Sequence, residues 1–183
     1  IALQINHRRS FDFDIFLYEP FNSNLLAKAH KIFGPGCVQT LNITDQINLV
    51  TPENISVTFF YDSAPPLFPV IKMEPIDLMD LRDLASNKAV TIGFRGKWRD
   101  YVDVYFLLKE KKTTLKEIIS VSQKRRGSEF STRLFLQQLT YFEDLIDYNI
   151  DFIGNPVSPD EIKNFISEQA KDIIKQVDNL RKH

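Results

Sequence analysis

The first 76 residues contain short stretches in which apolar and polar positions alternate. In the segment SFDFDIF, Phe11, Phe13 and Ile15 alternate with Asp12 and Asp14. A strand places alternate side chains on opposite faces, so the segment predicts a strand with one apolar face. The other face would carry two carboxylates roughly 7 Å apart.

Three further strands and one helix are expected in this part of the chain. Residues 37–44, 46–51 and 55–62 are rich in β-branched and aromatic residues, which favours strands. Residues 25–34 predict a short helix that ends at Gly34. A proline-rich crossing follows at residues 63–75.

After residue 76 the apolar positions recur with a helical period. The predicted helices span residues 81–94, 97–111, 115–126, 131–147 and 158 almost to 183. The starts are indicated by Asp80 with Asp83, by the capping box Thr114 with Glu117, and by the Ser158–Glu161 segment. Gly96 and Gly127 separate helices. The last helix has an apolar side formed by Ile162, Phe165, Ile166, Ile173, Val177 and Leu180.

This order of elements predicts an α+β fold, with a small mixed sheet flanked by helices and then a helical C-terminal half. The predicted domains are a sheet core at residues 1–76 and a helical half at residues 77–183 that packs on it. The chain begins with Ile1 instead of Met, so we expect an N-terminal part of the core to be missing.

The composition is that of an ordinary globular protein and excludes a strong general attraction to nucleic acid. The 183 residues carry a net charge of −1, with 43% hydrophobic and 26% charged residues. The single cysteine, Cys37, cannot form an internal disulfide, which favours a reducing cytoplasm. No apolar run has the length of a membrane span, so no membrane partner is expected.

The strongest candidate for chemistry is the carboxylate pair. Asp12 and Asp14 on one strand face form either a solvated surface or a site for a hard cation such as Mg²⁺. Arg8, Arg9 and Ser10 directly precede the pair. Positive charge and a hydroxyl beside a cation site suit a phosphate-bearing ligand.

Lys88 is a second candidate because it has helical spacing with apolar residues of its own segment. A buried lysine without a partner is costly, so the ammonium either snorkels to water or reaches a phosphate or the two aspartates.

Asp100 and Asp103 lie in an apolar helical segment. Asp100 is explained by the helix dipole or by pairing with Arg95, Lys97 or Arg99. Asp103 lies deeper in the apolar run and needs a stronger reason.

Two other groups of residues give weaker signals. His7, His30 and His183 do not cluster with Cys37 in the sequence, which makes a zinc site improbable. The basic run Lys124–Gly127 is typical of a solvated helix end, with contact to an RNA backbone as the alternative.

Taken together, three features resemble the AbiEii/AbiGii toxin family of nucleotidyltransferases, within the polymerase-β-like nucleotidyltransferase superfamily. They are the segment ALQINHRRSFDFDIF, the segment DLASNKAVTIGFRGKWRDYVDVYFLL and the spacing between them, which together extend from about Ile1 to Leu108. The pattern Arg-x-Ser-x-Asp-x-Asp followed by these helical motifs is much more specific than Asp-x-Asp alone.

The resemblance implies roles for the matching positions. Arg8, Ser10, Asp12 and Asp14 match the first motif, in which the aspartates hold the divalent metal that bridges the nucleotide phosphates. Lys88 matches the lysine that contacts those phosphates. Arg99, Asp100 and Asp103 match the motif RDxxD of the helical part, where an acid is needed for activity. The active cleft is expected between the strand and these helices.

Two features depart from the superfamily pattern. A Gly-Gly-Ser/Thr signature is expected just before ALQ, upstream of Ile1. A third carboxylate, commonly the general base, is expected on a later strand, but the segment ISVTFFYD offers Ser56 and Thr58 on one face and no acid before Asp62. The base is therefore Asp62, or Asp103, or absent.

The resulting expectation is an enzyme that transfers a nucleoside monophosphate from an NTP to a hydroxyl of tRNA or protein, with Mg²⁺ or Mn²⁺. The resemblance implies the toxin of a toxin–antitoxin or phage-defence pair, with a cognate antitoxin as partner. The alternatives are a catalytically decayed nucleotidyltransferase scaffold with a binding or regulatory role, and a purely structural partner-binding protein.

Overall fold

The computed structural model describes residues 1–21, 24–74 and 76–180, without the side chains of residues 95 and 177–180. The chain forms two compact units. We call Ser10–Pro65 the sheet unit, and Ile1–Arg9 together with Pro66–His183 the helical unit. The predicted division into domains 1–76 and 77–183 stays a prediction, because compact units need not fold independently.

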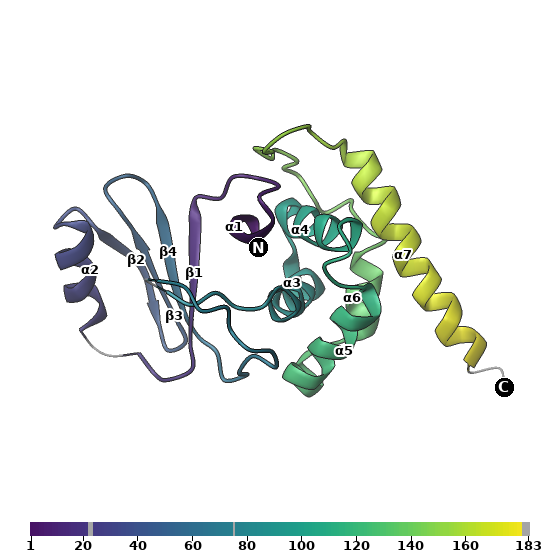
Figure 1. Ribbon diagram of the computed structural model, residues 1–183, viewed down its shortest axis with the longest axis horizontal. Helices are drawn as coiled ribbons and strands as arrows, with labels where there is room; N and C mark the ends of the chain where they lie inside the picture. Colours follow the sequence, from purple (N-terminus) through teal and green to yellow (C-terminus); the bar gives the residue numbers. More distant parts are fainter. Residues whose placement is uncertain (22–23, 75, 181–183) are drawn as a thin grey trace. The chain divides into compact units, whose positions relative to one another are not determined.

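The sheet unit contains a four-stranded mixed sheet in the order β1-β4-β3-β2 (Figure 1). Its elements are β1 Asp12–Leu17, α2 Leu25–Phe33, β2 Val38–Ile43, β3 Gln46–Val50 and β4 Ser56–Tyr61. Edge strand β1 runs parallel to β4, whereas the other two pairings are antiparallel. The predicted strands and short helix are therefore confirmed, with ends that differ by one or two residues.

Helix α2 packs on one face of this sheet. The core beneath it contains Ala29, Cys37, Ile47, Leu49 and Val57, with Ile15 and Phe59 packed against them. The helix ends at Gly34, whose φ of 87° suits a residue without a Cβ. Because side chains alternate along β1, Asp12 and Asp14 lie on the face opposite to α2.

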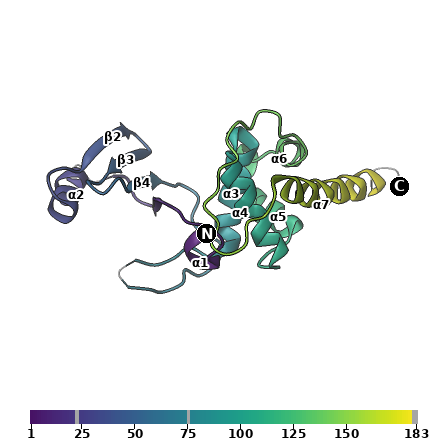
Figure 2. The ribbon, with the colours of Figure 1, turned by 90° about the horizontal axis from the view of Figure 1, so that it is seen from above.

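The helical unit begins with the short helix α1 Ala2–Ile5 and continues from residue 66 (Figure 2). Its further helices are α3 Leu81–Arg95, α4 Trp98–Lys109, α5 Leu115–Arg126, the 3₁₀ turn Gly127–Glu129, α6 Thr132–Gln138 and α7 Pro159–Leu180. The side chains of Asp80 and Thr114 cap α3 and α5 as expected. No helix among the described residues is long and apolar enough to cross a membrane.

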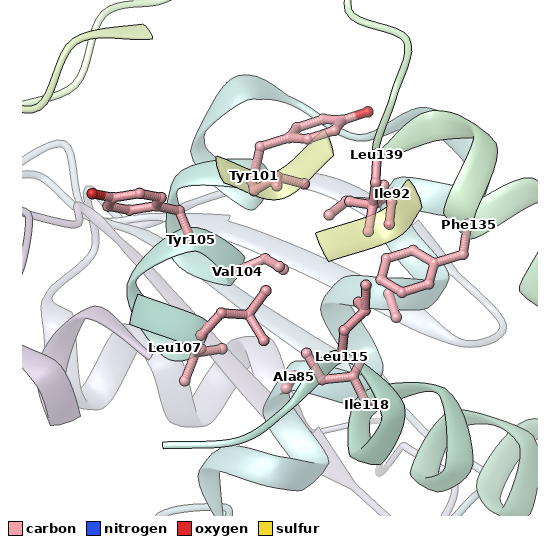
Figure 3. Packing of buried hydrophobic residues seen from close by; sticks show 14 of the residues in the cluster. Ala85, Ile92, Tyr101, Val104, Tyr105, Leu107, Leu115, Ile118, Phe135 and Leu139 are labelled. Carbon is pink, nitrogen blue, oxygen red and sulfur yellow. The ribbon is translucent and has the colours of Figure 1, made fainter. Parts of the chain in front are cut away.

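Helix α4 is the centre of the helical core (Figure 3). One buried cluster contains Tyr101 and Leu107 of α4, Ile92 of α3 and Phe135 of α6, all almost fully buried. On α7, Ile162 and Ile166 are buried and Phe165 and Ile173 partly buried, as the apolar pattern predicts. The side chains of Val177 and Leu180 lie outside the described part.

A tight corner at Gly96 joins α3 to α4. A Cβ at this position would lie 3.0 Å from the Cα of Ile92 and 3.0 Å from the ring of Tyr101. A larger residue would require the Ile92 backbone and the Tyr101 ring to shift by a few tenths of an ångström. The corner therefore fixes how the side chains of α3 meet those of α4.

The predicted helix at residues 131–147 is too long, because α6 ends at Gln138. The Thr140 hydroxyl donates to the carbonyl of Gln137, and such bonds compete with helical hydrogen bonding. The apolar residues beyond it pack as an irregular segment instead. Phe142 lies edge-on to Tyr101, and Tyr148 lies 4.9 Å from Trp98 between ring centroids.

Candidate active site

The two aspartates of β1 lie side by side with polar residues of the neighbouring strands. Asp12 is half-buried and Asp14 is exposed. In the strand register, Asp12 is paired with Ser56, and Asp14 with Thr58. Asn48 of β3 continues the second row. Paired residues share a face of the sheet, so this face offers two carboxylates bordered by hydroxyl and amide groups.

The positions next to the aspartates hold no third acid. Thr58 stands directly across from Asp14. Asp62 lies four residues after Thr58, just beyond the end of β4 and about 13 Å further along the strand direction. The Asp62 carboxylate instead accepts a hydrogen bond from the backbone N–H of Ala64. No cluster of three or more acidic, histidine or cysteine side chains that could hold a metal occurs among the described residues.

In the helical unit, Asp103 is fully buried on α4 and accepts hydrogen bonds from three side chains. Arg8 binds it with two parallel bonds, Nε to Oδ1 at 2.7 Å and Nη2 to Oδ2 at 2.9 Å. The Nε2 of His7 lies 2.8 Å from Oδ1, and the Nζ of Lys88 lies 3.1 Å from Oδ2. These contacts with Arg8, His7 and Lys88 explain why an acid occupies a buried position in an apolar helix.

Asp100 occupies the first turn of the same helix and has two tasks. Its Oδ2 accepts the backbone N–H of Lys97, which satisfies one of the free donors at the start of α4. Its Oδ1 accepts the ammonium of Lys88 at 2.7 Å. As the helix-dipole interpretation expects, Asp100 lies in the first turn of α4, and its side chain also pairs with Lys88, which comes from α3.

Lys88 joins the two acids and does not snorkel to water. Its side chain is 22% exposed and its ammonium touches both Asp100 and Asp103. Burial by itself disfavours the charged ammonium, but the two carboxylates outweigh it and raise the pKa of Lys88 above its usual value. The lysine therefore stays charged.

The charges around Asp103 have the opposite effect on its own proton. Burial alone would raise the pKa of Asp103. The hydrogen bonds from His7 and Arg8 and the positive charges of Lys88 and Arg8 lower this pKa well below its usual range. A carboxylate held in this state is a very weak base.

The structure thus brings four of the predicted site residues together in the helical unit. They are Arg8, Lys88, Asp100 and Asp103. Arg99 lies on the same helix but is exposed. Ser10, Asp12 and Asp14 belong to the sheet unit, and Ser10 is exposed.

His7 is the member of this network that sequence reasoning missed. It lies directly before Arg8, and adjacent side chains of an extended chain point to opposite sides. The left-handed conformation of Asn6, with φ 53°, precedes it and redirects the backbone at the end of α1. A positive φ at an ordinary residue leaves only a weak sequence signal, although asparagine tolerates it best.

Two predictions about charged residues of α3 and α5 are wrong. Asp83 does not cap α3 but accepts the backbone N–H groups of Leu67 and Phe68, both at 3.0 Å. The basic run Lys124–Gly127 is not wholly solvated, since the side chain of Arg125 is fully buried and lies 3.7 Å from the Asp83 carboxylate. Arg125 is thus not available to an RNA backbone.

Comparison with known proteins supports the fold. No family profile matches the chain. The chain is 26% identical over 181 residues to the uncharacterized protein aq_aa25 of Aquifex aeolicus, covering 95% of this chain and 84% of that protein.

Two solved structures from Helicobacter pylori are similar to the chain. One is a "putative nucleotidyltransferase", with TM-score 0.51 and 18% identity over 94% of this chain and 81% of that one. The other is JHP933, with TM-score 0.49 and 18% identity over 96% of this chain and 80% of that one. The likeness to the first structure, with the mixed sheet and helical C-terminal half, shows that the protein has a nucleotidyltransferase fold, as the sequence predicts.

Proposed function

We propose that the protein is a Mg²⁺- or Mn²⁺-dependent nucleotidyltransferase that moves a nucleoside monophosphate from an NTP to a hydroxyl of a tRNA or a protein. The observation that carries this proposal is the state of Lys88. Its ammonium has three N–H donors, and two contacts, to Asp100 and Asp103, are made within the described residues. A charged, partly exposed lysine with a remaining donor suits a phosphate group.

Asp12 and Asp14 are the residues proposed to hold the metal. Mg²⁺ is commonly bound through one or two carboxylates together with substrate phosphates, and two carboxylates on one strand face fit that pattern. When bound, the ion would neutralise charge on the transferring phosphorus and orient the attacking hydroxyl.

The remaining roles follow from burial and charge. Ser10 and Arg99 are exposed and are proposed to contact the nucleotide, whereas Arg8 and Asp100 act through their partners in the network. Asp103 is saturated with donors and is proposed to hold Lys88 in place instead of serving as a base. The attacking hydroxyl then releases its proton to solvent while pyrophosphate leaves, since phosphoryl transfer depends mainly on positioning and electrostatics.

The resemblance to AbiEii/AbiGii toxins supports a proposed biological setting. In that setting the protein is the cytoplasmic toxin of a toxin–antitoxin or phage-defence pair, and a cognate antitoxin binds it. This part of the proposal is tested separately, by asking whether expression of the protein stops growth and whether a neighbouring gene relieves it.

The decisive experiment is the transfer of label from each of the four α-³²P NTPs, with Mg²⁺, into total tRNA and into protein. The full-length protein is compared with the variants Asp12→Asn/Asp14→Asn and Lys88→Met. Lys72→Met is the matched control, because Lys72 is exposed and pairs only with Asp77 among the described residues. We expect label with the native protein and with the control, and none with the two site variants.

A second candidate function is that of a binding or regulatory protein on a nucleotidyltransferase scaffold. The observation in its favour is Thr58, which stands beside Asp14 where a third carboxylate is expected. This candidate predicts that Mg²⁺ with an NTP raises the melting temperature of the protein while no label is transferred. Asp12→Asn/Asp14→Asn would then remove the stabilisation by ligand.

A further inference from the structure

His7 is a buried imidazole with one nitrogen paired and the other unpaired. The residue is 3% exposed, and its ring lies against Phe106 with 4.7 Å between ring centroids. Its Nε2 lies 2.8 Å from the Asp103 carboxylate. Its Nδ1 is buried and has no hydrogen-bond partner among the described residues.

The tautomer follows from these contacts. An ionised carboxylate only accepts hydrogen bonds, so Nε2 carries the proton and donates it to Asp103. A second proton on Nδ1 would bury a donor without an acceptor and add a third positive charge beside Arg8 and Lys88. The network thus sets Arg8 and Lys88 against Asp100 and Asp103, with His7 donating a hydrogen bond from Nε2 to Asp103.

Neither packing nor charge balance explains why an imidazole occupies this position. Arg8 and Lys88 already give Asp103 three donors and two positive charges. A phenylalanine would keep a ring against Phe106 without burying an unpaired nitrogen, which is costly. The imidazole is the third side chain that contacts the carboxylate. It binds Oδ1, whereas Lys88 contacts Oδ2.

The segment that carries His7 is itself held in place. The backbone N–H of Ile153 donates to the carbonyl of His7 at 3.0 Å, and that of Arg9 donates to the carbonyl of Asp151 at 2.8 Å. These two bonds flank an antiparallel bridge between Arg8 and Phe152. His7 and Arg8 thus form a fixed support for Asp103 that comes from a different segment than Lys88 of α3.

We propose that His7 is a positioning residue, which holds the Asp103 carboxylate so that its Oδ2 keeps the Lys88 ammonium directed toward the phosphates of the substrate. Where it concerns turnover, this inference rests on the proposed function. Its structural part, the control of Lys88 by His7 through Asp103, stands independently of any activity.

Three substitutions separate the hydrogen bond from the shape of the side chain. His7→Phe keeps the ring and removes the donor. His7→Gln places an amide N–H near the position of Nε2, whereas His7→Asn places it near Nδ1, away from Asp103. His7→Gln is therefore the rescuing variant, and His7→Asn is its matched control of similar polarity.

The first readout is the ¹H–¹⁵N NMR signal of the Lys88 ammonium in the full-length protein without ligand. We expect slow hydrogen exchange in the native protein and in His7→Gln, and exchange at least ten-fold faster in His7→Phe and His7→Asn. Equal exchange in all four proteins would overturn the proposal. Should His7→Phe fail to fold, the comparison of the Gln and Asn variants still decides.

The second readout is the transfer of label under saturating NTP. Loss of a hydrogen bond to a charged group typically lowers the equilibrium or rate constant that depends on it by about 10- to 100-fold. We expect a loss of this size in kcat for His7→Phe and His7→Asn, with a KM for NTP within a few-fold of the native value and recovery in His7→Gln. A kcat that is unchanged in His7→Asn would contradict the proposal. A native protein that transfers no label refutes the proposed function but leaves the ammonium test intact.

Discussion

The sheet unit and the helical unit each carry a pair of aspartates, but in opposite environments. Asp12 is half-buried and Asp14 is exposed on one face of edge strand β1, where no other acid shares their rows. Asp100 and Asp103 are buried on α4 and are neutralised by cations of the same unit. The first pair is where we propose that an external cation binds, whereas the second pair holds a lysine and an arginine in place.

Both pairs consist of aspartates, so the residue type alone does not tell a carboxylate proposed to bind a metal from one that positions another side chain. A carboxylate that binds a metal must keep oxygen atoms accessible. A carboxylate that positions another side chain works best when it is buried, because the surrounding packing fixes the orientation of its oxygen atoms. The two pairs should therefore respond differently when their charge is removed, by mutation or by pH.

The largest effect is expected from Asp103→Asn. The substitution leaves Arg8 and Lys88 buried without full compensation, and breaking a buried ion pair in this way costs about 3–5 kcal/mol in the free energy of unfolding. Urea denaturation followed by circular dichroism measures it. A loss below about 1 kcal/mol would show that the network does not hold the helical unit together.

The pH dependence of stability is expected to show the same network without mutation. Asp103 has a lowered pKa, so the unfolded chain takes up its proton first as pH falls below about 3.8, and stability is lost there. Lys88 has a raised pKa, so the unfolded chain loses its proton first as pH rises above about 10.5, and stability is lost there too. Urea midpoints between pH 3 and 11 test this, and both losses should shrink in Asp103→Asn.

An intermediate effect is expected from Arg125→Lys in the second buried pair. The Nη1 of Arg125 donates to the carbonyl of Asp83 at 3.0 Å and to the side chain of Asn87 at 2.8 Å, while its Nε lies 3.7 Å from the Asp83 carboxylate, and the single nitrogen of lysine cannot occupy both positions. We expect a loss of about 1–3 kcal/mol. The amides of Leu67 and Phe68, which Asp83 binds, should exchange with solvent faster. Lys124→Met, one position earlier and exposed, is the control and should change neither quantity.

The smallest effect is expected from Asp12→Asn/Asp14→Asn. Removing two neighbouring like charges from one strand face should raise the free energy of unfolding by about 0.2–1 kcal/mol. The same change should abolish binding of Mg²⁺ with an NTP, measured by calorimetry. Opposite signs for this variant and for Asp103→Asn would establish the contrast between the two pairs, and a large destabilisation here would remove it.

The sequence predicts local features of this protein well. Alternation places Asp12 and Asp14 on one face of β1, and capping residues give the starts of α3 and α5 correctly. Such signals depend on neighbours a few positions apart. The helix end at Gln138 is missed because an apolar segment of the right period packs equally well as a loop.

The partners within the candidate site are harder to predict. Lys88 is recognisable as an unusual lysine, and Asp103 as an acid that needs a reason, but nothing local says that they meet. His7 gives no signal at all, since its partner is 96 positions away. Long-range pairing depends on the tertiary fold, and it leaves no periodic pattern of residues in a single sequence.

The separations within the network also have a consequence for synthesis on the ribosome. Lys88 and Asp100 are 12 positions apart and are brought together by the corner at Gly96, so they can pair as soon as both helices have emerged. His7 and Asp103 close a loop eight times longer, at an entropic cost greater by about 2 kcal/mol. Their support also includes residues 151–153. The segment that carries His7 must therefore wait until residues 151–153 have been translated before it reaches its final position.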